Sequence, residues 1–249
     1  MRRSLITFGR ASLKLPVRTK KRKSAARGIA SALTGGVLQG NERSAYVNAL
    51  TDLTLEIYEG ERVALIGHNG AGKSTFLRLV SGIFSPTSGS MNVHTYATPL
   101  IDKSFIIDTD LTGYEVCRAH YIRHNAHKVS YSAYIDDIID FTELGEFLEA
   151  PVSSYSDGMR TRLMFAMITS FSHPLLAMDE GIAAGDRFFI EKASTRFEKF
   201  LTNTSTLILA SHDEQLLRRF TQRGLVLDKG RLVFDGCLDA ALEYYHSSR

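Results

Sequence analysis

The fold is decided by one short stretch of the sequence, Gly67-His68-Asn69-Gly70-Ala71-Gly72-Lys73-Ser74-Thr75. It matches the pattern G-x-x-x-x-G-K-[ST] of a phosphate-binding loop. An apolar run typical of a buried strand, Val63-Ala64-Leu65-Ile66, directly precedes it. The stretch therefore has the strand–loop–helix context that the pattern requires, and it predicts a phosphate-binding site.

Each residue type in the loop has a physical role. Gly67, Gly70 and Gly72 allow backbone N–H groups to turn toward phosphates with no Cβ in the way. Lys73 is expected to bring a positive charge to the β- and γ-phosphates, and Ser74 to bind Mg²⁺. A helix is expected to begin near Lys73, where the positive end of its dipole adds to the attraction. The remaining nucleotide contacts predicted in this loop are Asn69, Ala71 and Thr75.

Polar residues follow two further apolar segments. The run Pro174–Met178 ends in Asp179 and Glu180, and Leu207–Ala210 is followed closely by His212. Ligands of open α/β sheets bind at the carboxyl ends of strands, so these side chains are expected beside the phosphate loop. Asp179 is expected to hold Mg²⁺ directly or through water, Glu180 to act as the base that orients the attacking water, and His212 to bond the γ-phosphate.

The segment Ser154-Tyr155-Ser156-Asp157-Gly158-Met159 resembles the signature loop of ABC-type ATPases, whose usual form is Leu-Ser-Gly-Gly-Gln. Ser156 and Gly158 match that form. The phosphate loop, this segment, Asp179 and His212 also occur in the family's order, and Asp186 falls at the family's D-loop aspartate. The resemblance covers about residues 50–236. It implies that Ser156, Gly158, Asp179 and Asp186 contribute to the nucleotide site.

The same resemblance implies an α/β fold: a P-loop NTPase (ABC ATPase) core with a mostly parallel sheet, an N-terminal antiparallel β layer and an inserted helical subdomain. A single ABC ATPase domain is expected over residues 1–249, with a basic segment and the first strands in 1–44 and the helical subdomain at about 108–168. The implied ligands are ATP and Mg²⁺, and the implied reaction is ATP hydrolysis. A second copy of the chain is expected to complete an ATP-sandwich homodimer.

Departures from the usual motifs resemble the ATPases of bacterial polysaccharide exporters. The first lies in the signature itself, where Tyr155-Ser156-x-Gly158-Met159 replaces the usual form. The others lie at Leu111-Thr112-Gly113, at residues 151–155, and at residues 179–186. This implies export of O-antigen, capsule or teichoic-acid chains with a polytopic membrane-spanning permease subunit, at the cytoplasmic face of the bacterial inner membrane. No appended carbohydrate-binding domain is expected after residue 236. Two alternatives stay open: a soluble ABC ATPase acting on ribosomes or DNA, and a nucleotide switch with little turnover.

Two family features are matched only in part. The Q-loop glutamine is absent, because the sequence has no Gln between Gln39 and Gln215. Asp102 and Asp108 are the nearest oxygen ligands that could take its place. Tyr46 falls roughly where the family has an aromatic residue that stacks on adenine, although a structural tyrosine is almost as consistent with the sequence.

Charge is distributed unevenly along the chain. The net charge of the 249 residues is +3, yet residues 1–30 hold ten Lys and Arg and no acid, so the remaining residues carry −7. The basic stretch 18–27 is interpreted either as a solvated loop or as a contact with an anionic membrane surface. Nucleic acid is not expected as a partner, because neither interleaved aromatic residues nor a known binding fold accompanies the charge. Two cysteines favour a reducing compartment.

Three local expectations complete the analysis. Ser4–Phe8 and Ala11–Leu15 read as two short strands, the second closed by Pro16. Residues 111–150 are expected to be mostly helical. Within them, a Cys/His face with helical spacing is expected to be a polar docking or solvent face rather than a zinc site; it consists of Cys117, His120, His124 and His127.

Overall fold

The structure, a computed structural model, describes residues 3–17, 38–39, 45–100, 109–124, 129–179 and 187–248. The chain divides into two compact units. The first consists of Met1–Ile101, His173–Glu180 and Thr204–Arg249, and the second of Asp102–Ser172 and Gly181–Asn203. The assignment of residues 1–249 to one domain stays a prediction. Among the described residues, no helix combines the length and the apolarity that a membrane span needs.

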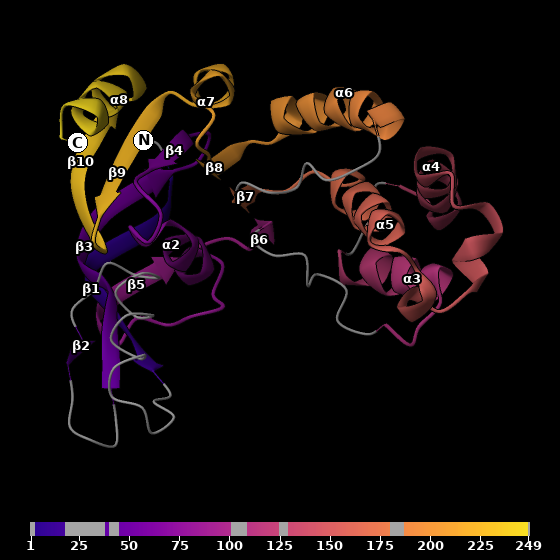
Figure 1. The fold of residues 1–249 in the computed structure, drawn as a ribbon, viewed down its shortest axis with the longest axis horizontal. Coiled ribbons are helices and arrows are strands. Elements are labelled where there is room, and N and C mark those ends of the chain that lie inside the picture. The colour runs from indigo at the N-terminus through magenta and orange to yellow at the C-terminus, as the bar shows by residue number, and fades with distance from the viewer. Residues whose placement is uncertain are drawn as a thin grey trace. The chain divides into compact units, whose positions relative to one another are not determined.

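A six-stranded sheet forms the centre of the first unit, in the order β10–β9–β4–β8–β7–β6 (Figure 1). Every neighbouring pair is parallel except β10 with β9. Strands β7 and β8 are buried along their whole length, as parallel strands covered on both faces are. The mostly parallel sheet is therefore confirmed. The strands are β4 (Arg62–Ile66), β6 (Ala97–Leu100), β7 (Leu175–Met178), β8 (Thr206–Ala210), β9 (Arg223–Asp228) and β10 (Arg231–Cys237).

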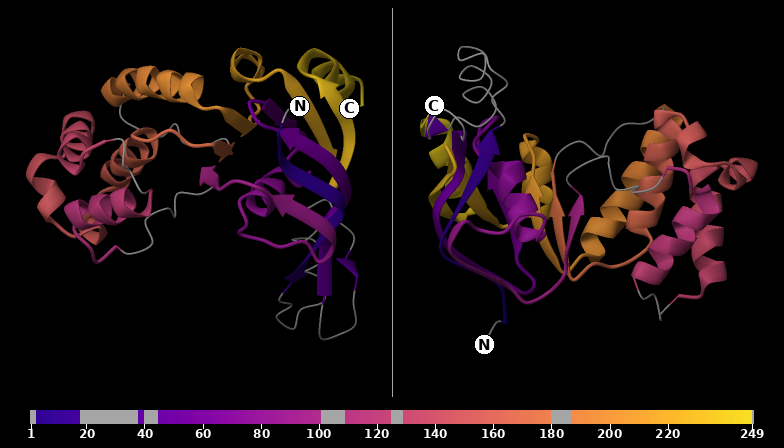
Figure 2. Two further views of the ribbon diagram at one scale, coloured as in Figure 1. Left: turned by 180° about the vertical axis from the view of Figure 1, so that it is seen from behind. Right: turned by 90° about the horizontal axis from the view of Figure 1, so that it is seen from below.

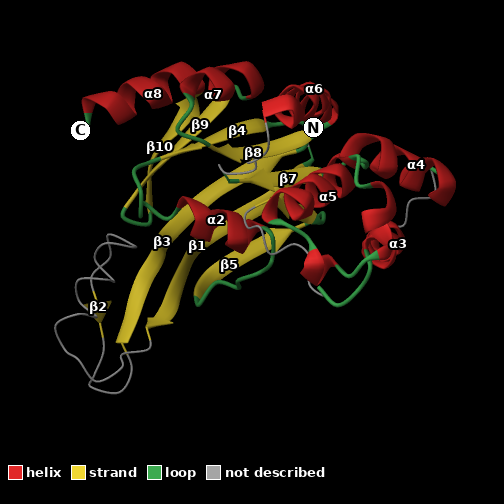
Figure 3. Ribbon diagram, turned by 45° about the vertical axis from the view of Figure 1, so that its right-hand side comes forward, coloured by secondary structure: helices red, strands yellow, loops and turns green. Residues whose placement is uncertain are grey.

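The first unit also contains an antiparallel sheet in the order β2–β3–β1–β5 (Figure 3). This sheet is the N-terminal β layer that the family resemblance implies. The long strands β1 and β3 pair along almost their whole length. The strands are β1 (Ser4–Val17), β2 (Leu38–Gln39), β3 (Ala45–Tyr58) and β5 (Ser88–Val93).

The prediction of two short N-terminal strands is wrong, because β1 is continuous. Its pairing with β3 shifts register between Phe8 and Ala11, and Arg10 has a φ of 52°, so an irregularity takes the place of the predicted break. Pro16 lies inside the strand, opposite Tyr46. Strand β5 pairs with β1 only as far as Ser12. The proline is tolerated because, among the described residues, no strand pairs with β1 on the other side at that point.

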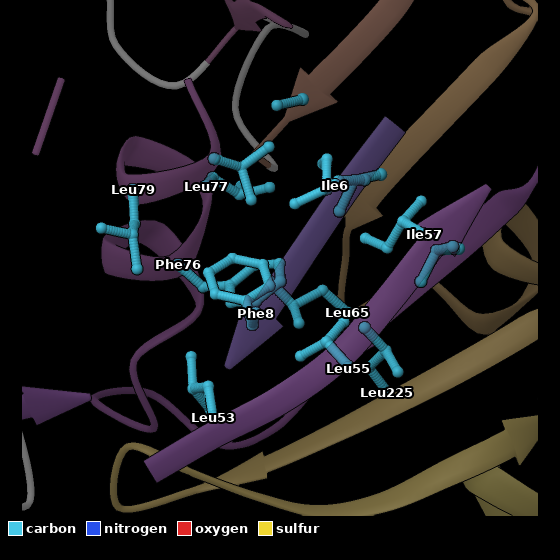
Figure 4. Packing of buried hydrophobic residues seen from close by; sticks show 14 of the residues in the cluster. Ile6, Phe8, Leu53, Leu55, Ile57, Leu65, Phe76, Leu77, Leu79 and Leu225 are labelled. Atoms are coloured by element: carbon cyan, nitrogen blue, oxygen red, sulfur yellow. The ribbon is translucent and has the colours of Figure 1, made fainter. Parts of the chain in front are cut away.

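Side chains from both sheets meet helix α2 (Lys73–Val80) in one buried cluster (Figure 4). Phe8 of β1 and Phe76 of α2 stack with their ring centroids 5.5 Å apart. Full burial of each such ring stabilises the fold by about 2–3 kcal/mol. The cluster fixes α2 against β4, and the phosphate loop connects these two elements.

Two C-terminal helices, α7 (Glu214–Phe220) and α8 (Leu238–Ser247), belong to the same unit. Helix α8 packs on β9 and β10 (Figure 2). The approach is close at Gly224, where an added Cβ would lie 2.3 Å from the Cβ of Ala241. A glycine at this position lets α8 pack closely on β9.

The second unit is helical, as the inserted subdomain was expected to be. The expected helical character of residues 111–150 is seen in α4, which buries Tyr134, Ile138 and Phe141. Helix α3 begins at a capping box between Thr112 and Glu115. The helices are α3 (Gly113–Arg123), α4 (Tyr131–Thr142), α5 (Asp157–Thr169), α6 (Arg187–Asn203) and the short 3₁₀ helices η2 (Gly145–Glu149) and η3 (Val152–Ser154).

Arg196 of α6 joins three helical segments of this unit. Its guanidinium donates to both carboxylate oxygens of Asp137, at 2.8 and 2.6 Å, and to Thr169 Oγ1 at 2.6 Å. The same group lies over the ring of Phe141, 4.4 Å from the centroid. Burial alone would raise the pKa of Asp137, but the hydrogen bonds and charge of Arg196 outweigh it and lower that pKa.

Candidate nucleotide-binding site

The phosphate loop runs from the end of β4 to the first residue of α2. Gly67 cannot carry a side chain, because a Cβ would lie 2.5 Å from the carbonyl oxygen of Leu227. Gly72, the N-cap of α2, has a φ of 109°, which disfavours any side chain. The glycines therefore give the chain room to turn back before the helix begins, as the sequence predicts.

The ammonium group of Lys73 is held over this loop. Its Nζ donates to the carbonyl oxygens of Gly67 at 2.6 Å and His68 at 3.2 Å. The residue is only 9% exposed. A buried positive charge is thus fixed at the loop, where it can attract an anion.

Asp179 follows β7, and its backbone N–H donates to the Leu100 carbonyl oxygen at 3.0 Å. Its carboxylate accepts a hydrogen bond from the hydroxyl of Ser74 in α2. The two predicted metal ligands, 105 residues apart in sequence, are therefore brought together. Hydroxyl and carboxylate oxygens are ligands that Mg²⁺ prefers, so these residues fit that ion.

His212 lies in the loop between β8 and α7. Asp213, the next residue, caps α7 by accepting from the N–H groups of Gln215 and Leu216. The imidazole Nε2 of His212 is 3.1 Å from the side-chain oxygen of Asn69, so this ring lies against the phosphate loop. The predicted proximity of His212 to the loop holds.

These elements line one pocket of about 530 Å³, a volume within the usual range for small-molecule sites. Leu15, Ala49 and Arg78 belong to its lining and were missed by the sequence analysis. Arg78 lies four residues after Ser74 on α2, a spacing that could have identified it. Leu15 and Ala49 come from the antiparallel sheet and carry no comparable signal. The predicted residues in the lining are Asn69, Gly70, Gly72, Lys73, Ser74, Thr75, Asp179 and His212.

Among the described residues of the first unit, three other predicted residues lie outside this lining. Gly67 and Ala71 pack against the β9–β10 segment instead. Gly67 lies against the carbonyl oxygen of Leu227, and Ala71 is fully buried, with its carbonyl oxygen accepting from the Gly230 N–H at 2.9 Å. Tyr46 is 42% exposed on β3. Its stacking on adenine stays a prediction.

The predicted signature residues lie in the second unit, at the start of α5. Ser156 is the N-cap, and its side chain accepts from the Met159 N–H at 3.2 Å. Gly158 lies in the first turn. The preceding Tyr155 is buried, and its hydroxyl donates to the Phe147 carbonyl oxygen at 2.6 Å.

Burial raises the pKa of Tyr155 to about 12, so its hydroxyl stays a hydrogen-bond donor. Its oxygen lies only 2.4 Å from where a Cβ on Gly113 would be. The tyrosine therefore depends on a glycine at the start of α3.

The prediction of a polar docking or solvent face on α3 is wrong for Cys117 and His120. Cys117 is fully buried and His120 is 6% exposed, because this side of the helix packs on α4; the His120 ring lies 3.0 Å from the Tyr134 hydroxyl. Burial raises the pKa of the Cys117 thiol to about 12. No group of three or more metal-binding side chains occurs among the described residues.

Several predicted features fall outside the described residues. They include the predicted base Glu180 and the D-loop residue Asp186. They also include the two candidate replacements for the Q-loop glutamine, Asp102 and Asp108. His127 and the basic stretch 18–27 also fall outside the described residues. Their roles stay predictions.

A phosphate loop between a parallel strand and a helix, with a carboxylate at the carboxyl end of another strand of the same sheet, defines a nucleotide-binding protein of the P-loop class. The family model described as ABC transporter matches residues 50–183. The chain belongs to this family and is an ATPase of its class.

Relatives with known assignments include the O-antigen export system ATP-binding protein RfbE of Yersinia enterocolitica. It is 33% identical over 94% of this chain and 98% of its own length. The teichoic acids export ATP-binding protein TagH of Shouchella clausii is 32% identical over 79% of this chain and 54% of its own length. The chain thus spans about half of TagH.

Solved structures share the fold. An ATP-binding subunit of an ABC transporter superimposes with a TM-score of 0.66 at 21% identity, over 97% of this chain and 93% of its own. A dimeric ATP-binding cassette bound to ADP and Pi gives a TM-score of 0.65 at 19% identity, over 94% of this chain and 98% of its own.

Proposed function

We propose that this chain hydrolyses ATP to drive the export of polysaccharide or lipid-linked, O-antigen-like glycan across the bacterial inner membrane. The observation that carries this proposal is the similarity to RfbE, an O-antigen export protein, along nearly the full length of both chains. In this proposal the protein sits at the cytoplasmic face of the membrane and is held there by a polytopic permease subunit.

Within the site, Lys73 and the loop bind the phosphates of ATP, and Ser74 and Asp179 hold Mg²⁺. The bond between the hydroxyl of Ser74 and the carboxylate of Asp179 supports this assignment, since it places two oxygen ligands side by side. Bound Mg²⁺ would neutralise charge on the phosphates. Glu180 takes the proton of the attacking water, and His212 bonds the γ-phosphate.

A second copy of the chain completes the site. Each chain has one phosphate loop and one signature segment, so the simplest closed assembly is a two-fold dimer in which each loop faces the partner's signature. Ser156 and the N-terminus of α5 would then meet the γ-phosphate bound by the other copy, with Asp186 at the same interface. The dimeric cassette of similar fold supports this arrangement.

The test is co-purification. The tagged full chain, isolated from its native membrane in mild detergent, should bring down a polytopic membrane protein, and ATP hydrolysis by the complex should rise when a lipid-linked glycan is added. Sedimentation with ribosomes and no membrane protein would favour the soluble ABC ATPase. ATP binding without steady-state phosphate release would favour the nucleotide switch.

A further inference from the structure

His68, the second residue of the phosphate loop, forms two hydrogen bonds through its ring. Nδ1 lies 2.7 Å from the backbone carbonyl oxygen of Asn69, and Nε2 lies 2.9 Å from Oδ1 of Asp228. A carbonyl oxygen and a carboxylate oxygen both accept and cannot donate. Both ring nitrogens must therefore carry hydrogen, so the ring that makes both bonds is the charged imidazolium.

Asp228 ends β9 and leads into the tight turn to β10, where Lys229 and Gly230 have φ values of 45° and 77°. This turn touches the phosphate loop a second time, through the Gly230 N–H and the Ala71 carbonyl oxygen at 2.9 Å. The Gly230 carbonyl oxygen in turn accepts from the Thr51 N–H of β3 at 2.8 Å. The turn is thus a support that joins the loop to both sheets.

Four backbone carbonyl oxygens of the phosphate loop accept hydrogen bonds from the protein. Those of Gly67 and His68 accept from Lys73, and that of Ala71 accepts from Gly230. The Asn69 carbonyl is held by the ring of His68. A phosphate is repelled by carbonyl oxygens and attracted by N–H groups. Fixing these four carbonyls on protein donors therefore favours a loop shape that accepts phosphate.

We propose that His68 is a positioning residue for nucleotide binding, which in its charged form ties Asn69 of the phosphate loop to Asp228 of the β9–β10 turn. The inference rests on the proposed nucleotide site. Because the side chain of Asn69 also meets Nε2 of His212, His68 fixes the residue against which His212 lies.

The charged and titratable groups around His68 come from three elements. Lys73 of α2 donates to its carbonyl oxygen, and Asp228 and the exposed Lys229 lie in the β9–β10 turn. His212 approaches through Asn69 from the loop after β8. Asp228 is the acid in hydrogen-bond contact with the ring.

The affinity for nucleotide should therefore fall as pH rises through the range in which histidines lose their charge, about pH 5 to 8. The side chains of His68 and Asp228 are 43% and 49% exposed. Solvent screening limits such a pair, so the change attributable to it should be about three- to fivefold in Kd.

The experiment measures ADP binding to the full chain by calorimetry at pH 6 and pH 8, without Mg²⁺. ADP's own protonation affects every variant alike, so the comparison is between variants. His68→Gln should bind about three- to fivefold more weakly than the parent at pH 6 and equally at pH 8. His68→Arg, which keeps charge and donors at both pH values, should bind well at both. Asp228→Asn should resemble His68→Gln.

His246→Gln is the matched control. His246 pairs with Glu214 at 2.7 Å with side chains 52% and 41% exposed, and this pair joins α8 to α7 rather than to the phosphate loop. It should keep the parental pH profile. The proposal is overturned if His68→Gln keeps that profile too, or if His68→Arg still loses affinity at pH 8. Lys73→Ala, measured alongside, distinguishes failure of the His68 proposal from failure of the nucleotide site. Parental ADP binding by Lys73→Ala would refute the nucleotide site itself.

Discussion

The two units hold their central charges in different ways. In the first unit, the ammonium of Lys73 is bound by backbone carbonyl oxygens of a loop whose glycines leave no room for side chains. In the second unit, Arg196 is bound mainly by side chains and lies over an aromatic ring. Substituting Lys73 should therefore change ligand binding and leave the fold intact, whereas substituting Arg196 should change stability.

The largest effect is expected for Lys73→Ala. The variant loses the buried charge at the loop, so ATP hydrolysis should fall by on the order of 10³ in kcat/KM. Phosphate release by the purified chain measures it. Circular dichroism and denaturation should show a fold as stable as the parent's. If the variant hydrolyses ATP at the parental rate, Lys73 does not belong to the nucleotide site.

Glu180→Gln should come next. It keeps the size of the side chain but removes the base, so hydrolysis should fall by on the order of 10² while ATP still binds. The closed dimer should then accumulate with Mg-ATP, as light scattering can measure. A monomer at tens of micromolar protein would mean that the membrane partner brings the copies together, and a dimer with normal turnover would exclude Glu180 as the base.

For the second unit, Arg196→Ala should lower the free energy of unfolding by about 2 kcal/mol. The value is set below that of a fully buried pair because Asp137 is 45% exposed while Arg196 is 17% exposed. Urea denaturation measures the change.

Its matched control is Arg218→Ala, which breaks the pair with Asp239, whose side chains are 51% and 82% exposed. That variant should lose about 0.5 kcal/mol or less. Equal losses for the two arginines, or a change in ADP affinity with Arg196→Ala, would contradict the division between the units.

The smallest effect is expected for the loss of stability at low pH that is due to Asp137. The pKa of Asp137 is lower in the folded chain than in the unfolded chain, so its ionised form stabilises the fold above the ordinary carboxyl pKa of about 3.9. That contribution is lost as pH falls through the folded value. Since the group is half exposed, it should amount to about 1 kcal/mol or less.

Asp137→Asn has no charge to lose, so its stability should fall less than the parent's between pH 5 and pH 3. Denaturation midpoints at both pH values provide the comparison. A parallel fall for parent and variant would show that Arg196 does not depend on this carboxylate.

The difference between the units also explains what the sequence predicts. Glycines, Lys73 and strand-end acids act through backbone geometry, which local patterns encode, so the loop, Asp179 and His212 were placed together correctly. Cys117 and His120 were misassigned to a polar face because their burial depends on Tyr134, in another helix, which no local pattern reveals. The continuous β1 was missed for a similar reason, since pairing with β3 carries the chain past Arg10 and Pro16.

The contact between Tyr155 and Gly113 has a consequence for how such chains diverge. The tyrosine hydroxyl lies where any side chain at position 113 would begin, 2.4 Å from the position of its Cβ. A side chain at position 113 would therefore displace Tyr155, and a smaller residue at position 155 would remove only part of the constraint, because Leu148 Cδ2 lies 2.8 Å and Leu148 Cα 3.1 Å from the same Cβ position. Positions 113, 148 and 155 should therefore change together during evolution rather than one at a time.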